Sequence, residues 1–376
     1  MKKIFLTAIA ILTMASTQVF GMYGVDTDWI FFLTHGNQFR ARLDQLGFTL
    51  GNDMIKGTFG FDNNTGFGGT YGAMLQRDGN IGDFYKWVPT ISMGIGYTSS
   101  LISVGVGYNA TVGPRIGKYN GKDTEKQVNK STHTPVLVLN AMDNAFRMAI
   151  PIQVYVNNDK YPDIAGGGKN SEMAVSVDSQ FRYYTGLDML PQIRLYLRYG
   201  LYQNEYTPSQ GNKEKTKFAE SFGFDFRLYF GSMVEEVALQ PLVKLAYNTA
   251  LGKYHNLARV QAVNAMNGSY ATISPRWETG VWNLTLMTAL GLTANSDIVS
   301  IYLEPSLGLN VTQNGSATQK NVKETYGLGY DVYAEIYITP LKNLEWYFEA
   351  SIGNVGDTPG VAFAGTTGIT WYLPAL

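Results

Sequence analysis

The side chains that most often do chemistry are scarce in this sequence. Its 376 residues contain three histidines, at positions 35, 133 and 255, and no cysteine. None of these histidines has a partner at the spacing of a metal-binding motif. His133 follows Ser131 and Thr132, but neighbours in sequence do not make a catalytic triad, and an ordinary loop histidine is the simpler interpretation. We therefore expect no enzyme activity, no metal site and no cofactor.

Charged residues are the remaining candidates, because many occupy every second position of an apolar run. Arg194 and Arg198, for example, alternate with aliphatic and aromatic residues. Such alternation is typical of a β-strand, whose successive side chains point to opposite faces. If the aliphatic face contacts lipid, the charged face lines a lumen. The candidate lumen residues are Arg147, Arg182, Arg194, Arg198, Arg227 and Lys244 in the middle strands, with Asp178 and Asp225 interspersed, and Glu304, Asp331, Glu335, Glu345 and Glu349 in the later strands.

One arc of the predicted wall is thus mainly basic and another mainly acidic. Facing rows of opposite charge set a transverse field across a water-filled pore, which favours polar solutes over apolar ones. This pattern predicts a general porin-like channel for small polar solutes. The alternative is that the charges pair across a lumen filled by side chains or by the Trp29–Phe32 segment. In an open pore, neutralising Arg194 and Arg198 changes ion selectivity or conductance.

The hairpin at residues 89–111 shows the alternation most clearly. Ile91–Tyr97 and Ile102–Tyr108 each place apolar residues on one face and small or polar residues on the other. Ser99-Ser100 supplies the turn. Gly94-Ile95-Gly96 and Gly105-Val106-Gly107 lie within strands rather than before a helix. They are therefore no phosphate-binding loop, and we interpret them as small lumen-facing residues.

Similar runs continue to the C-terminus, separated alternately by tight turns and long polar loops. Strands of about 10–13 residues match a tilted strand that crosses a membrane. The sequence predicts an all-β fold: a single antiparallel transmembrane β-barrel of about 16 strands (alternatively 14), with short periplasmic turns and long extracellular loops. Early strands are expected at 39–43, 55–61 and 69–75, and a short helix near 257–265 within the longest loop, 248–279. Pro89, Pro241 and Pro305 fall inside strands, which requires bulges or a position near a membrane boundary.

The N-terminus carries a basic start, an apolar run and a small-residue exit, the pattern of a secretory signal peptide. Cleavage is expected after Gly21, with Ser16 or Thr17 as alternatives. The apolar run is too short to favour an uncleaved anchor. The expected organisation is a signal peptide at 1–21, a helical or lumen-plugging segment at 22–37, and the barrel at 38–376. The mature protein is then surface-exposed in a bacterial outer membrane.

Composition agrees with a membrane barrel. Aromatic residues make up 13% of the chain, tyrosine and glycine number 25 and 41, and charged residues make up 16%. The mean hydropathy of -0.09 averages a lipid face with a watery face. A net charge of -1 argues against a nucleic-acid partner. Aromatic residues near strand ends are expected to form interfacial girdles, namely Trp87, Tyr97, Tyr108, Tyr183, Tyr199, Trp282, Tyr326, Tyr330, Trp346 and Trp371.

Several motifs mark the start of the mature chain: Met22-Tyr23-Gly24, Trp29-Ile30, Thr34–Phe48 and the Gly-Ile-Gly-Tyr and Gly-Val-Gly-Tyr repeats of the 91–108 hairpin. In these motifs the chain resembles the variable surface protein (Vsp) family of the intestinal spirochaete Brachyspira. The resemblance implies an abundant, surface-exposed and antigenic outer-membrane protein found in multimeric assemblies. It brings no catalytic residues.

Three other functions stay open. The first is a surface adhesin or immune decoy, whose closed barrel only anchors loops such as 113–133 and 248–279. The second is a transporter of hydrophobic compounds with Trp29–Phe32 as a hatch, which the charged inner wall disfavours. The third is a soluble secreted all-β protein. The expected partners are outer-membrane lipid, further copies of the chain, and host ligands or antibodies at the loops.

Overall fold

The described part of the protein is a closed antiparallel β-barrel. The computed structural model describes residues 23, 28–42, 45–63, 89–112, 116–119, 122–127, 130–161, 168–208, 211–252, 257–266, 277–353, 362–374 and 376. The barrel closes because β1 (Gln38–Arg42) pairs with both β2 (Gln45–Gly51) and the last strand, β19 (Ala362–Tyr372). Among the described residues, no helix is both long and apolar enough to cross a membrane.

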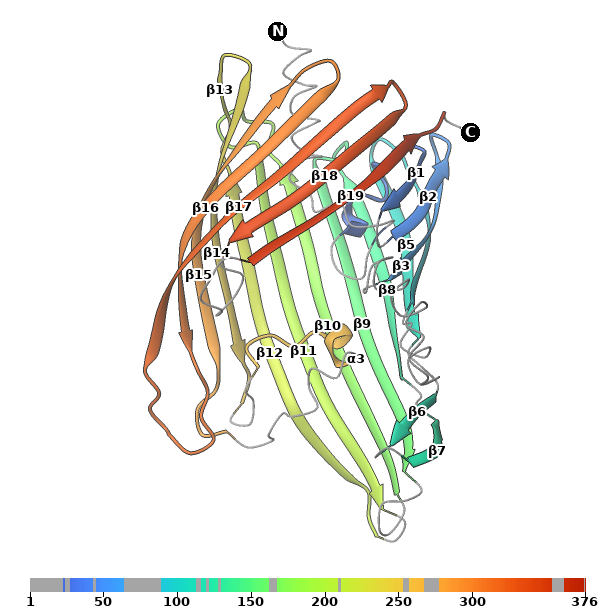
Figure 1. The fold of residues 1–376 in the computed structure, drawn as a ribbon, viewed down its shortest axis with the longest axis vertical. Helices are drawn as coiled ribbons and strands as arrows, with labels where there is room; N and C mark the ends of the chain where they lie inside the picture. Colours follow the sequence, from blue (N-terminus) through green and yellow to red (C-terminus); the bar gives the residue numbers. More distant parts are fainter. Residues whose placement is uncertain are drawn as a thin grey trace.

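The wall follows the order of the chain from strand to strand (Figure 1). Its other strands are β3 (Ile55–Asn63), β4 (Pro89–Tyr97), β5 (Ile102–Val112), β8 (Lys130–Ala141), β9 (Phe146–Tyr161), β10 (Gly168–Tyr184), β11 (Gln192–Pro208), β12 (Glu214–Tyr229), β13 (Ser232–Val234), β14 (Val237–Ala250), β15 (Trp282–Asn295), β16 (Val299–Gln313), β17 (Glu324–Leu341) and β18 (Leu344–Gly353). The short β13 continues β12 along β14, so the 17-stranded sheet of the described residues is a wall of sixteen strands. This confirms the predicted barrel.

The two ends of the barrel differ as the sequence predicts. Short turns gather at one end together with the C-terminus, and the long connections gather at the other (Figure 1). A separate hairpin of β6 (Ile116–Tyr119) and β7 (Lys122–Gln127) lies at the long-loop end. Several strands are longer than the predicted 10–13 residues: β10 and β11 have 17 each. They extend into residues 157–171 and 204–217, which the sequence pattern predicts to be polar loops.

Strand prediction was least accurate near the N-terminus. The predicted strands at 39–43 and 55–61 correspond to β1 and β3, whereas β2 was missed and the strand at 69–75 lies outside the described residues. The prolines occupy positions where a missing N–H is tolerated. Pro89 begins β4, Pro241 faces the break between β12 and β13, and Pro305 lies beside a gap in the β15–β16 register.

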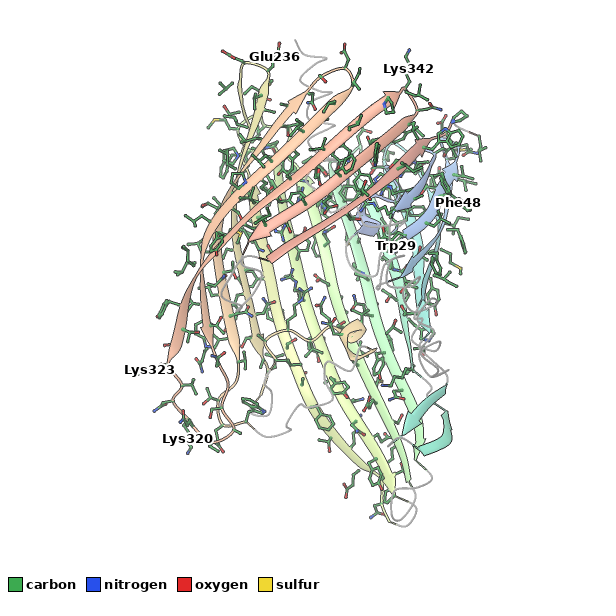
Figure 2. All side chains as sticks on the ribbon, viewed as in Figure 1. Trp29, Phe48, Glu236, Lys320, Lys323 and Lys342 are labelled. Carbon is green, nitrogen blue, oxygen red and sulfur yellow. The ribbon has the colours of Figure 1, made fainter. Side chains whose placement is uncertain are left out.

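The outer face is an apolar band. Ile95, Val106 and Leu307 are 59%, 53% and 55% exposed, and Phe48 points away from the barrel in Figure 2. Polar residues between them are buried on the inner face, as a lipid-facing wall requires. Expected girdle residues on this outer face include Tyr97, Tyr183, Tyr199, Tyr326, Tyr330, Trp346 and Trp371, all exposed; Trp87 lies outside the described residues.

Candidate functional site

Five of the six candidate cations of the middle strands form one lateral row on the inner wall, close to the short-turn end; Arg198 lies outside the row, opposite Asp178. Arg182 on β10 lies directly opposite Arg147 on β9 and Arg194 on β11. Arg194 lies opposite Arg227 on β12, which in turn lies opposite Lys244 on β14. We call these five residues the basic row. Like charges directly opposite each other on a sheet are destabilising, so the row needs compensation.

Part of that compensation comes from aromatic rings. The guanidinium carbons of Arg147, Arg182 and Arg194 lie 4.7, 4.4 and 4.3 Å from the ring centroids of Tyr184, Phe31 and Tyr229, respectively. A cation over a ring face is attracted by the ring quadrupole, the more so away from water. Arg227 and Arg198 share a single ring, that of Tyr196, at 4.8 and 5.7 Å.

Two aspartates supply the rest of the compensation. Asp225 lies 2.8 Å from Arg227, 3.6 Å from Arg198 and 3.7 Å from Lys244. Asp178 lies 3.3 Å from Arg198. The two carboxylates lie deeper in the wall than the cations: the Asp225 and Asp178 side chains are 2% and 7% exposed. The Arg198, Arg227 and Lys244 side chains are 14%, 24% and 26% exposed.

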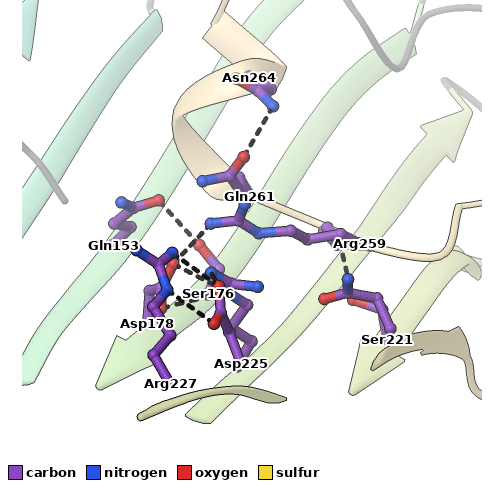
Figure 3. Close-up of polar contacts among 12 residues, drawn as sticks. Gln153, Ser176, Asp178, Ser221, Asp225, Arg227, Arg259, Gln261 and Asn264 are labelled. Atoms are coloured by element: carbon purple, nitrogen blue, oxygen red, sulfur yellow. Dashed lines mark hydrogen bonds and ion pairs between the residues drawn. The ribbon is translucent and has the colours of Figure 1, made fainter. Parts of the chain in front are cut away.

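The connection between β14 and β15 enters the lumen beside these aspartates (Figure 3). It carries the short helix α3 (Ala262–Met266), which confirms the predicted helix. Arg259 donates a hydrogen bond to Asp178 at 2.5 Å. The N–H groups of Val260 and Ala262 donate at 2.8 Å to the hydroxyls of Ser221 on β12 and Ser176 on β10.

Close packing fixes this inserted segment, which we define as residues 257–266. Val260, Ala262 and Ala265 are buried against Tyr155, Ala174, Tyr202 and Ala219 of the wall. At Gly200 on β11, a Cβ would lie 2.2 Å from the Val260 carbonyl oxygen, so glycine makes room for the segment. The sequence analysis assigned this region to a surface loop. Its described part instead lies inside the barrel.

The acidic arc on β16–β18 uses tyrosine in a different way. The Tyr302 hydroxyl donates to Glu304, the Tyr333 and Tyr337 hydroxyls donate to Glu335, and the Tyr372 hydroxyl donates to Glu345. Glu335 is 2% exposed. The ring faces thus bind the guanidinium groups of one arc, and the hydroxyls bind the carboxylates of the other.

One cationic strand, β1, is separated from the acidic arc only by β19. Arg42 on β1 lies 3.9 Å from Glu349 and 4.1 Å from the Tyr347 ring centroid. Glu349 also lies directly opposite Glu335 on the neighbouring strand, so Arg42 reduces the repulsion between two carboxylates. Asp331 lies on the same face of β17, displaced toward the long-loop end.

The N-terminal segment, residues 28–37, fills another side of the lumen. It begins with the 3₁₀ helix η1 (Asp28–Phe31), and Trp29 of this helix lies inside the barrel (Figure 2). Trp29, Ile30 and Phe32 are each 0% exposed. They pack with Val136, Val138 and Ala149 of the wall. Burying each such side chain contributes roughly 1.5–3 kcal/mol, so this segment is firmly held.

The glycine pairs of β4 and β5 make the surface on which this segment lies. A Cβ at Gly107 would lie 2.4–2.6 Å from atoms of the Trp29 ring, and one at Gly94 would lie 2.6 Å from it. At Gly96 and Gly105 a Cβ would lie 2.4 and 3.1 Å from Leu33. We call these four residues the glycine floor. Their lumen-facing position was predicted, but their specific role was not.

Polar contacts hold the far side of the N-terminal segment. The Lys56 ammonium donates to the carbonyl oxygens of Leu33 (3.0 Å) and His35 (2.5 Å), and Arg147 donates to the Thr34 hydroxyl (3.3 Å). His35 Nδ1 lies 3.0 Å from the Tyr23 hydroxyl. Burial, together with the nearby charges of Arg40, Lys56 and Arg147, lowers the pKa of His35 well below 6.5.

Burial therefore divides the lumen into a filled side and a more open side. On the filled side, Asn109 and Thr134 on β5 and β8 are 1% and 0% exposed, and the Asn109 amide donates to the carbonyl oxygen of Tyr23. On the open side, inward-facing residues such as Lys244, Glu304 and Asn310 are only half-buried. Water reaches the inner wall along β14–β17.

The structure places all candidate residues on the inner face. It gathers Arg198, Arg227 and Lys244 around Asp178 and Asp225. Glu304, Glu335 and Glu345 each accept a hydrogen bond from a tyrosine hydroxyl. The sequence analysis missed Arg259 and Arg42. Arg42 alternates with Phe39 and Ala41 and was detectable as inward-facing, whereas no periodic signal points to Arg259.

The histidines do not form a chemical centre in the described structure. His133 belongs to β8 rather than to a loop, and its ring contacts the hydroxyls of Tyr108 at 2.5 Å and Ser131 at 3.1 Å. His255 lies outside the described residues. Within the described ranges, no three His, Cys, Asp or Glu side chains are grouped so that they could hold a metal ion.

Comparisons with known proteins point to one family. The family model described as Serpulina hyodysenteriae variable surface protein matches residues 2–372. No curated protein matches. Among solved structures, the chain is similar to the translocator domain of the autotransporter NalP from Neisseria meningitidis, with 13% identity, coverage of 90% of this chain and 89% of that chain, and a TM-score of 0.33.

Proposed function

This chain belongs to the variable surface protein family of Serpulina hyodysenteriae, and from that premise we propose that it is a porin-like channel of the outer membrane. In this proposal the signal peptide is removed on export, the apolar band contacts lipid, and the long loops face the outside. Small polar solutes pass through the lumen, and the loops present the variable surface to host antibodies.

The observation that carries the channel proposal is the exposure of the inner wall along β14–β17. Lys244 and Glu304 remain half-buried although they point inward. A barrel wall with charged inward-facing residues that contact water has the physical character of an aqueous pore. The N-terminal segment narrows this pore from the β4–β9 side, and the inserted segment narrows it from the β9–β12 side.

A closed barrel that only anchors surface loops is the second candidate. The complete burial of Trp29 and Phe32 in the lumen favours it, because a firmly held plug opposes conduction. A transporter of hydrophobic compounds is disfavoured, because an apolar solute needs an apolar path and the basic row lines this one.

Single-channel recording of the purified, folded protein in a planar bilayer separates the two candidates. Stable conductance steps are expected for the channel. A folded protein that inserts without conducting would favour the anchor. In that case, binding by the surface loops should persist when the lumen is blocked. Extraction with alkaline carbonate tests the membrane location, since an inserted barrel stays in the membrane pellet.

A further inference from the structure

The basic arc presents cations to the lumen and keeps its carboxylates behind them. Arg198, Arg227 and Lys244 surround Asp225, and Arg259 reaches Asp178 from the inserted segment. The Arg259 side chain is 33% exposed, whereas Asp178 is 7% exposed. A solute in the lumen therefore meets positive charge first.

The basic row beside these cations also contains one arginine, Arg182, whose donors the described residues do not all satisfy. Arg182, next to Arg194 in the basic row, is 4% exposed, and its Nε and Nη1 atoms have no hydrogen-bond partner among the described residues. Buried donors without partners are unusual in folded proteins, and a guanidinium presents several donors in a fixed plane.

The exposed cations are also held in place before any ligand arrives. Tyr196 lies beneath both Arg198 and Arg227, and Asp225 contacts both of them from behind. Planar guanidinium groups fixed in this way match the geometry of carboxylate and phosphate oxygens. Preorganisation lowers the entropy lost on binding.

We propose that Arg198, Arg227, Lys244 and Arg259 form a binding site for small multivalent oxyanions, such as phosphate-type or polycarboxylate solutes. The proposal rests on the channel function above and names its solute class. A multivalent anion engages several donors at once, whereas chloride engages them singly and passes on. The site thereby concentrates such solutes within the pore.

Pyrophosphate is the probe, added at constant ionic strength to single channels of the full-length protein. It should reduce the wild-type current at millimolar concentration. The double variant Arg227→Gln/Lys244→Gln should need at least about tenfold more pyrophosphate, because charge-assisted hydrogen bonds are lost. Asp225→Asn removes the negative charge behind the cations, so a lower pyrophosphate concentration than for the wild type should reduce its current. Citrate in place of pyrophosphate distinguishes polycarboxylates from phosphates.

A matched control removes the same charge from outside this site. Lys213 and Lys217 are exposed on the long-loop side of β12, with side chains 58% and 49% exposed and glutamate partners of their own. The variant Lys213→Gln/Lys217→Gln should respond to pyrophosphate like the wild type. An equal loss of affinity in this control would overturn the site, since general charge would then explain the effect.

A second measurement separates this inference from the channel proposal. If the protein does not conduct, pyrophosphate should still raise the thermal unfolding midpoint of the wild type and of the lysine control, and not that of Arg227→Gln/Lys244→Gln. That result keeps the site and rejects the channel. Conduction without any effect of pyrophosphate rejects the site and keeps the channel. If the protein does not conduct and pyrophosphate does not stabilise it, both proposals are rejected.

Discussion

The two charged arcs of the lumen use tyrosine in opposite ways. In the basic arc, cations lie over ring faces, as Arg227 lies over Tyr196 at 4.8 Å. In the acidic arc, hydroxyls bind carboxylates, as Tyr337 donates to Glu335 at 2.9 Å. A ring face uses none of the guanidinium donors, so those of Arg227 that do not bind Asp225 stay available, whereas each tyrosine hydroxyl occupies one acceptor of its carboxylate. The basic arc is therefore better prepared for an anionic solute than the acidic arc is for a cation.

The largest expected effect comes from displacing the N-terminal segment, which contacts the basic arc through Phe31 over Arg182. Gly107→Val places a side chain where Trp29 packs against the glycine floor. The segment should leave its position, and single-channel conductance should rise severalfold.

The matched control for that variant is Gly327→Val on β17, where a Cβ would have no neighbour within 4 Å. It should conduct like the wild type. A folded Gly107→Val protein with unchanged conductance would show that the N-terminal segment does not limit the pore.

The next effect separates the arcs by charge. Arg194→Gln/Arg198→Gln should lower the ratio of anion to cation permeability severalfold, because it removes two charges from the basic arc. Glu304→Gln/Glu349→Gln removes two charges from the acidic arc and should raise the ratio. Zero-current potentials in a salt gradient measure both. If both variants changed the permeability ratio in the same direction, the division of the inner wall into a basic and an acidic arc would be contradicted.

A smaller effect tests the two uses of tyrosine. Tyr337→Phe removes a donor from the buried Glu335 and should lower the free energy of unfolding by about 1–3 kcal/mol. Tyr196→Phe keeps the ring beneath Arg198 and Arg227 and should cost less than about 0.5 kcal/mol. Urea titration of the detergent-folded barrel compares the two. Equal losses would show that the hydroxyl matters in both arcs.

The smallest effect concerns pH. The lowered pKa of His35 means that the seated N-terminal segment holds this ring neutral beside Tyr23, Arg40, Lys56 and Arg147. Once the segment is unseated, the ring regains its ordinary pKa of 6.5. Because the unseated form binds a proton below pH 6.5 and the seated form does not, a falling pH favours unseating. The equilibrium constant for unseating rises by up to about tenfold per pH unit.

Conductance recorded between neutral and mildly acidic pH measures this effect. Conductance should rise as the pH falls, but only modestly, because the seated form of the segment dominates over this pH range. His35→Gln should flatten the dependence. A variant that keeps the wild-type pH profile would show that another group is responsible.

Strand periodicity explains why so much of the barrel was predictable. Alternation assigned every candidate charge to the inner face, because a strand repeats every two residues. The same rule contains an unused signal. Tyr302 and Glu304, Tyr333 and Glu335, and Asp225 and Arg227 are each two residues apart, so they share a face and their contacts were predictable.

The contacts that escaped prediction are non-local. The alternating glycines of β4 and β5 indicate an inner face without side chains, but only the folded structure reveals that Trp29 packs on it. Arg259 lies in a segment without periodicity, and its position depends on a long-range contact with Asp178. The strand β2 was missed although Leu46, Phe48 and Leu50 alternate regularly, because the run is short and only two residues separate it from β1.

The zero-current potential of the unmodified protein, measured across a planar bilayer with a steep KCl gradient, tests the central claim most directly. A water-filled lumen in which Arg198, Arg227, Lys244 and Arg259 meet the solute should give a potential of the sign for chloride preference, and pyrophosphate should reduce the current. A potential of the opposite sign, with no response to pyrophosphate, would mean that the acidic arc controls passage and that the cations serve only to hold the barrel together.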